Sequence, residues 1–207
     1  MGDLIQLEGA RRSRDHARRV PRAELFFDLS CPFTYVVADR VTHAFPQAEW
    51  HPASASALQR LAPDARDEDV RRAAERLAST AGLPIVWPGD YPCEVPAAMR
   101  AASYATECGR ARAFVLAASR LAFCGGFDLD DPEILAEAAA AAGMSLIETL
   151  HAAGDTRRDG PIEAAGRRLL AVGADRLPAL RVGRTLMWGA DRVTSASTAA
   201  VARPVQL

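Results

Sequence analysis

The chain has 207 residues, enough for one domain with a sizeable hydrophobic core or for a small domain that carries an insertion. Its formal net charge is -1, so the protein has no overall field that would attract nucleic acid. No apolar run reaches the length of about 18 residues that a membrane span needs. We therefore expect a soluble protein whose partners include neither nucleic acid nor a membrane.

Residues 1–21 are interpreted as an N-terminal extension that is solvated or loosely docked. It is locally basic through Arg11, Arg12, Arg14, Arg18 and Arg19. It contains no apolar segment of secretory length, so we expect a cytoplasmic location. All 25 basic residues of the lysine and arginine class are arginine, which excludes a mechanism that needs a lysine base or a Schiff base.

The first part of the chain predicts a β-α-β unit. Residues 22–30 are mostly apolar, as in a strand buried on both faces, and an amphipathic helix is expected from about residue 32 to 45, where Pro46 ends it. A second strand is expected at residues 48–52. The two strands should run parallel, with a right-handed crossover between them.

From about residue 57 to 172 the apolar residues recur at helical spacing, which predicts an all-helical insertion. Asp131 followed by Pro132 predicts a helix start, and Gly143 and Gly173 predict helix ends. The expected helices cover residues 67–81, 95–108, 111–124, 132–142, 145–154 and 161–172.

The last part of the chain predicts two strands and a helix. Short apolar runs at residues 176–182 and 184–189 flank Gly183, which indicates a hairpin, and a closing helix is expected at residues 190–202. We therefore predict an α/β fold in which residues 22–56 and 173–207 form one domain and residues 57–172 are the helical insertion.

The most informative motif is Cys31-Pro32-Phe33-Thr34, which lies where the first strand ends and the first helix begins. Unpaired N–H groups and the positive dipole end of a helix N-terminus favour a thiolate, and thiolate fraction controls cysteine reactivity. Pro32 suits the first helical position because its fixed φ matches the helix. We predict that Cys31 is a reactive thiol with a pKa below the free value of about 8.5. The alternative is that Cys31 is a small buried hydrophobic residue.

Residues 24–41 around this motif resemble the first strand and helix of the DsbA family, whose members have a thioredoxin fold. The family includes DsbA-like oxidoreductases, 2-hydroxychromene-2-carboxylate isomerases and kappa-class glutathione transferases. Residues 96–132, 177–183 and 188–192 match later segments of the family in the same order. The resemblance implies a thioredoxin-like domain with an inserted helical domain, and it places Cys31 at the attacking position.

Two residues of the motif depart from the dithiol members of this family. Thr34 stands where those enzymes have their resolving cysteine, so the chain should not act as an ordinary dithiol oxidase. Its hydroxyl could donate to the Cys31 thiolate, or it could bond to the backbone instead. Phe33 replaces a histidine of strongly oxidising members, which removes any stabilisation of the thiolate by that ring.

The resemblance also implies roles for residues far from the motif. It implies a cis bond between Leu177 and Pro178 opposite Cys31, with the Leu177 backbone free to pair with a thiol peptide such as glutathione. Asp191, beside Arg192, corresponds to a ligand of the γ-glutamyl end of the bound thiol. As an alternative, Asp191 is only an acidic residue that complements a helix dipole.

Of the other cysteines, Cys93 stands where isomerase-like members carry an asparagine that faces the active site. We interpret it as a pocket wall, with a resolving cysteine as the alternative. Cys108 and Cys124 are expected in the core, on apolar helix faces. The cysteine and histidine spacings fit no metal site.

We therefore expect a cytoplasmic enzyme that uses Cys31 as a single reactive thiol in thiol-disulfide exchange or thiol transfer. It should hold no permanent cofactor, and glutathione or another low-molecular-weight thiol is the expected cosubstrate. One alternative is a thiol-dependent isomerase or transferase that acts on an aromatic substrate, and another is a thioredoxin-like binding module without catalysis. The sequence leaves open whether the chain forms a homodimer.

Overall fold

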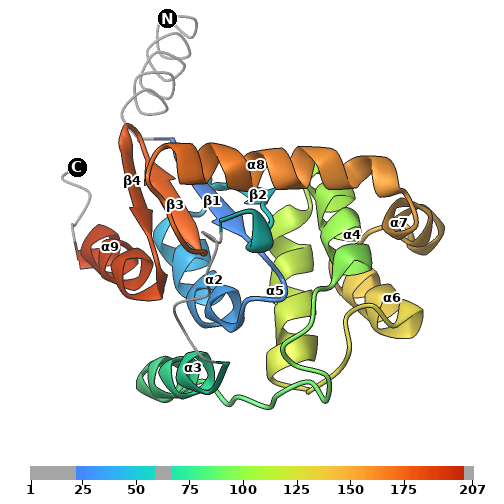
Figure 1. Cartoon of the computed structure of the whole chain (residues 1–207), viewed down its shortest axis with the longest axis horizontal. Helices are drawn as coiled ribbons and strands as arrows, with labels where there is room; N and C mark the ends of the chain where they lie inside the picture. Colours follow the sequence, from blue (N-terminus) through green and yellow to red (C-terminus); the bar gives the residue numbers. More distant parts are fainter. Residues whose placement is uncertain (1–21, 59–66, 203–207) are drawn as a thin grey trace, which may run out of the picture.

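A four-stranded mixed sheet, with strand order β2-β1-β3-β4, lies towards one side of the computed structural model (Figure 1). The structure describes residues 22–58 and 67–202, so the basic extension expected at residues 1–21 lies outside it. Within the described residues, no helix has the length and apolar character needed to cross a membrane.

The sheet is built from the strands expected from the sequence. Strand β1 (Ala23–Phe27) runs parallel to β2 (Glu49–Pro52), and α2 (Pro32–Ala44) connects them. Strand β3 (Ala179–Val182) pairs antiparallel with β1 and also with β4 (Thr185–Trp188). The expected β-α-β unit and terminal hairpin are confirmed. The chain then enters α9 (Ala190–Ala202), which has the expected bounds.

Hydrophobic side chains cover both faces of the sheet. Leu25 and Leu180 lie on the face that packs against α2 and α9, where they are fully buried with Val41 and Val193. Phe26 belongs to a second, smaller cluster on the other face, which α8 covers. The burial of β1 therefore alternates, with Ala23, Leu25 and Phe27 fully packed on one face and Glu24 and Phe26 only partly buried on the other.

Between β2 and β3 the chain is helical, as the spacing of apolar residues predicts. Asp131 caps its helix through a 2.8 Å bond from the Glu133 N–H, and Gly143 and Gly173 have the positive φ expected at helix ends. The helices are α3 (Asp67–Ala81), α4 (Pro96–Glu107), α5 (Ala111–Phe123), α6 (Pro132–Ala141), α7 (Leu146–Ala153) and α8 (Asp159–Ala171), with short 3-10 turns η1 (Ser56–Leu58) and η2 (Thr156–Arg158).

Cys108 and Cys124 are not in the core, so that expectation is wrong. Both residues are exposed, because α4 ends at Glu107 and α5 ends at Phe123, one residue earlier than the pattern suggested. Each cysteine is the C-cap of its helix and has left the apolar face that continues the helical period.

Helix α8 approaches the loop after β2 so closely that only glycine fits at one position. A Cβ atom added to Gly166 would lie 2.6 Å from the Ser54 carbonyl oxygen and 2.8 Å from the Ala57 Cβ. The same loop supplies the Ala55 N–H that binds Asp28 next to Cys31. The packing of α8 therefore supports the loop that contacts the candidate site.

We predict that Gly166→Ala lowers the free energy of unfolding by about 1–3 kcal/mol, because the added methyl group overpacks this contact. The measurement is urea denaturation followed by circular dichroism. Gly160→Ala, at an open position of the same helix, is the control and should leave stability unchanged or slightly higher. Equal stability of the two variants would contradict the close packing.

Candidate active site around Cys31

Cys31 lies at the junction between β1 and α2, and its backbone has not yet entered the helix. It is the N-cap of α2, with φ -88° and ψ 114°, and Pro32 follows at the helix start with its ring buried. The Cys31 N–H donates to the Asp28 carbonyl at 3.2 Å, which closes a turn at the end of β1. The expected position of Cys31 at a helix N-terminus is confirmed.

The start of β3 brings Leu177 and Pro178 to Cys31. The Leu177–Pro178 peptide bond is cis, as the resemblance implied. The Cys31 thiol donates to the Leu177 carbonyl with a sulfur to oxygen distance of 3.7 Å, across 146 positions of sequence. Two segments far apart in the sequence therefore meet at the cysteine, where Leu177 and Pro178 are buried.

The surroundings of Cys31 favour the neutral thiol, so the expected low pKa is wrong. Although part of the residue reaches solvent, protein atoms surround the sulfur, and burial together with the Asp28 carboxylate raises the pKa of Cys31 to about 12. The Phe33 and Thr34 N–H groups act in the opposite direction but do not outweigh burial. The Leu177 carbonyl adds to this preference, because it accepts from a thiol and repels a thiolate.

Asp28 is a buried carboxyl that the sequence interpretation overlooked. It is 6% exposed, and it accepts from the Ser30 N–H at 2.9 Å, the Ser30 hydroxyl at 2.7 Å and the Ala55 N–H at 2.7 Å. Burial raises the pKa of Asp28, although these bonds oppose the shift. An acidic residue within the otherwise apolar run Leu25–Leu29, three positions before Cys31, was the signal that could have identified it.

Thr34 bonds to the backbone, which was the second of the two interpretations left open. Its side chain is fully buried, and its hydroxyl donates to the Asp28 carbonyl at 2.7 Å. A hydroxyl has one proton, so Thr34 would have to release this carbonyl in order to donate to the Cys31 sulfur. This hydrogen bond stabilises the turn between β1 and α2.

Aromatic residues from the segment between α3 and α4 form one side of the site. The Tyr91 ring lies 4.6 Å from Trp87 and 6.1 Å from Phe123. The Arg71 guanidinium stacks over Trp87 and Tyr91, at 4.7 and 4.9 Å from the ring centres, and donates to the Tyr91 carbonyl at 2.6 Å. Burial and the nearby Cys31 sulfur raise the pKa of Tyr91, so a neutral phenol stands beside the cysteine.

A small pocket with a cavity volume of about 30 Å³, open to solvent, adjoins the end of β1. Ser30, Tyr91 and Cys93 line it, and Val95 and Phe123 supply part of its apolar floor. Cys93 is partly buried in the wall, which agrees with the pocket-wall interpretation. Burial and the carboxylates of Asp128, Asp90 and Asp130 raise the pKa of Cys93, which makes it a poor nucleophile.

Not all of the other predicted site residues contact the groups around Cys31. Phe33 is half-buried and packs against the main core. Asp191 and Arg192 are exposed in the first turn of α9, and within the described residues neither side chain bonds to the groups around Cys31. The Arg192 guanidinium instead lies 5.3 Å from the centre of the Trp188 ring.

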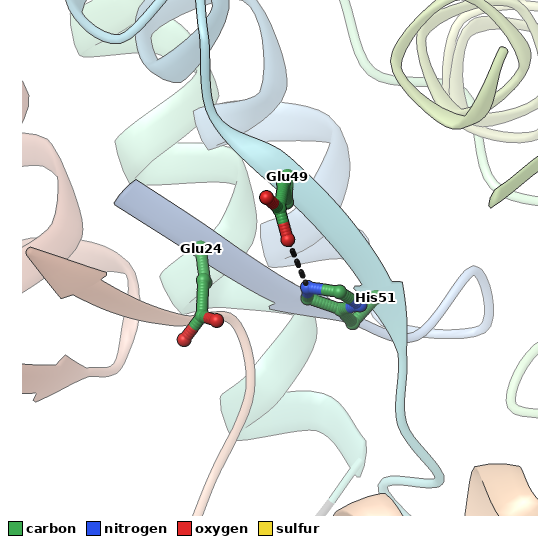
Figure 2. A group of neighbouring side chains, drawn as sticks. All are labelled: Glu24, Glu49 and His51. Carbon is green, nitrogen blue, oxygen red and sulfur yellow. Dashed lines mark ion pairs between the residues drawn. The ribbon is translucent and has the colours of Figure 1, made fainter. Parts of the chain in front are cut away.

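Sheet pairing brings together one set of metal-ligating side chains that sequence spacing did not indicate. Glu24 on β1 and Glu49 and His51 on β2 place ligand atoms within 4.8 Å of one another (Figure 2). Both carboxylates already have cationic partners, since Arg22 reaches Glu49 at 2.6 Å and Arg181 reaches Glu24 at 2.9 Å. Glu24, Glu49 and His51 therefore belong to an ion-pair network with Arg22 and Arg181.

A mixed sheet of this order, with a cysteine at the N-cap of α2 and the start of β3 beside it, is typical of thioredoxin-fold proteins. The chain belongs to the DSBA-like thioredoxin domain family, whose model matches residues 22–199. The expected family and fold, with helices inserted between β2 and β3, are confirmed. No sequence among the curated proteins matches this chain.

Solved structures with the same fold include enzymes of different chemistry. A 2-hydroxychromene-2-carboxylate isomerase aligns with TM-score 0.70 and 15% identity over 86% of this chain and 93% of that chain. A probable DsbA oxidoreductase from Streptomyces coelicolor aligns with TM-score 0.66 and 21% identity over 90% and 92%. The cytosolic disulfide reductase DsbM from Pseudomonas aeruginosa aligns with TM-score 0.66 and 16% identity over 87% and 95%.

We predict that iodoacetamide at neutral pH modifies the exposed Cys108 and Cys124 before Cys31, because the Cys31 thiol is neutral in the free protein. Peptide mapping by mass spectrometry measures the order. Asp28→Asn should increase the rate at Cys31 several-fold by removing a negative charge that raises its pKa, whereas Asp39→Asn on α2 should not. Fastest labelling of Cys31 in the unaltered protein would contradict the raised pKa.

Proposed function

We propose that the protein is a thiol-dependent oxidoreductase of the DsbA family that uses Cys31 alone for thiol-disulfide exchange or thiol transfer. The observation that carries the proposal is the position of the Cys31 sulfur at the N-terminus of α2, 3.7 Å from the Leu177 carbonyl oxygen. Thr34 fills the place of a second thiol in the motif. We place the reaction in the cytoplasm.

The reaction begins when the Cys31 thiol loses its proton to solvent. The sulfur then attacks one sulfur of a disulfide substrate, so that a Cys31 mixed disulfide forms and the other half leaves as a thiolate, which takes up a proton. A second small thiol releases the first half and restores Cys31. Because Thr34 cannot attack the mixed disulfide, this intermediate should persist until an external thiol arrives.

A second candidate function is isomerisation or conjugation of an aromatic substrate with the help of a small thiol. The pocket favours it, because Phe123, Phe127 and Val95 offer apolar surface next to Ser30 and Tyr91. Glutathione or a similar small thiol would then bind along Leu177 and Pro178. The first candidate needs Cys31 to react with a disulfide, whereas the second needs only that a small thiol binds beside Cys31. A chain that does neither would be a binding module.

The experiment that separates these functions compares variants at the Thr34 position. The unaltered protein should form a stable mixed disulfide at Cys31 with a small disulfide and should reduce insulin poorly. Thr34→Cys should raise insulin reduction at least several-fold, because it supplies a resolving thiol. Thr34→Ser is the control, since it keeps a hydroxyl for the Asp28 carbonyl and adds no thiol.

Insulin reduction by the unaltered protein at the rate of Thr34→Cys would contradict the single-thiol proposal. In that case Cys93 would be the candidate for a resolving cysteine outside the motif. Loss of the mixed disulfide in Cys31→Ser, with the fold retained by circular dichroism, is the matching expectation for the nucleophile.

A further inference from the structure

The pocket lined by Ser30, the residue before Cys31, combines an apolar floor with an acidic opening. Asp90 and Asp128 line the pocket and are exposed, while Val95, Phe123 and Leu129 are buried beneath them. The two carboxylates come from different segments, one after Trp87 and one after α5, so the fold gathers them at this opening.

Other carboxylates strengthen the negative field around the pocket and Cys31. Asp28 lies close enough to Cys31 to raise its pKa, Glu94 acts in the same way on Asp28, and Asp130 acts on Cys93. Asp67 lies near Tyr91. Asp28 is buried and Asp130 is half-buried, so water screens these two charges less than those of the exposed Asp67, Asp90, Glu94 and Asp128.

The cations of this region do not balance these charges. Arg71 spreads its guanidinium over Trp87 and Tyr91 and lowers the pKa of Tyr91, so it offsets part of the field. Arg100 acts on Asp130, but it already forms a two-point ion pair with Asp159 at 2.7 and 2.8 Å. Among the described residues, carboxylates therefore outnumber guanidinium groups at the pocket.

We propose that this pocket selects a small thiol or disulfide with a positively charged amine a few bonds from the sulfur, and discriminates against acidic thiols such as glutathione. The inference rests on the proposed function and narrows its substrate class. An ammonium group at Asp90 and Asp128 is attracted, and the apolar floor accepts the carbon chain. A carboxylate at the same place is repelled.

Such a substrate also helps to activate Cys31. In the free protein, burial and Asp28 oppose formation of the thiolate. A substrate cation placed in the pocket offsets the field of Asp28 and favours the charged form of the sulfur. Proton loss, attack on the substrate sulfur and departure of the second half as a thiolate then follow as described above, with the substrate disulfide as the oxidant.

The experiment compares three small disulfides that differ mainly in charge: cystamine, which is a dication, 2-hydroxyethyl disulfide, which is neutral, and dithiodiglycolate, which is a dianion. Formation of the Cys31 mixed disulfide is followed by mass spectrometry of the full chain and its peptides. Each rate is divided by the rate of the same disulfide with 2-mercaptoethanol, which removes differences in intrinsic reactivity.

We expect the corrected rate to fall from cystamine to the neutral disulfide to the dianion, with about a tenfold difference between the extremes at low salt. Added salt should reduce the difference, because it screens exposed charges. The double variant Asp90→Asn/Asp128→Asn should lose most of it. Glu133→Gln/Glu137→Gln, on the nearby α6 but outside the pocket lining, is the control and should keep it.

Equal corrected rates for the three disulfides, or a faster dianion, would overturn the charge inference while leaving the proposed function intact. Failure of every disulfide to react at Cys31 would overturn the proposed function as well. Loss of the preference in the control variant would show that net charge, and not the pocket, sets the selectivity.

Discussion

The antiparallel pairing of β1 with β3 is the constraint on which the candidate site depends. It sets Phe26 opposite Ala179 and Leu25 opposite Leu180, so the residues that follow β1 meet those that precede β3. Cys31 and Leu177 are therefore neighbours although 146 positions separate them. The buried side chains of β1 and β3 fix this register, because a shift by one residue would move every apolar side chain to the other face.

Two opposing influences act on the cysteine that this pairing positions. The N-terminus of α2 offers the Phe33 and Thr34 N–H groups, which favour a thiolate. Burial, the Asp28 carboxylate and the Leu177 carbonyl favour the thiol, and their combined effect is larger. Position at a helix N-terminus therefore does not by itself produce a low pKa. In the free protein Cys31 is therefore a neutral thiol.

The sequence predicted most of the fold because hydrophobic period, caps and prolines act locally. The bounds of α3 and α9 agree with the expected ones, and Asp131 caps α6 as its position before Pro132 suggested. The errors at Cys108 and Cys124 arose at helix ends, where a shift of one residue separates a buried face from an exposed cap.

The chemistry of the site was harder to predict, because it depends on distances between segments that are far apart in the sequence. Sequence reasoning located Cys31 and the Leu177–Pro178 pair. It did not locate the charge of Asp28 or the approach of Tyr91, which a loop between α3 and α4 delivers. The raised pKa follows from these long-range contacts and from burial, which no local motif encodes.

The central claim is that Cys31 is a neutral thiol in the free protein. The most direct measurement is the pH titration of the Cys31 Cβ signal by NMR, in protein labelled with ¹³C at cysteine and assigned with Cys31→Ser. The account predicts that the signal keeps the chemical shift of a thiol from neutral pH to well above pH 9 and changes only as the pH approaches about 12. A thiolate shift at neutral pH would contradict it.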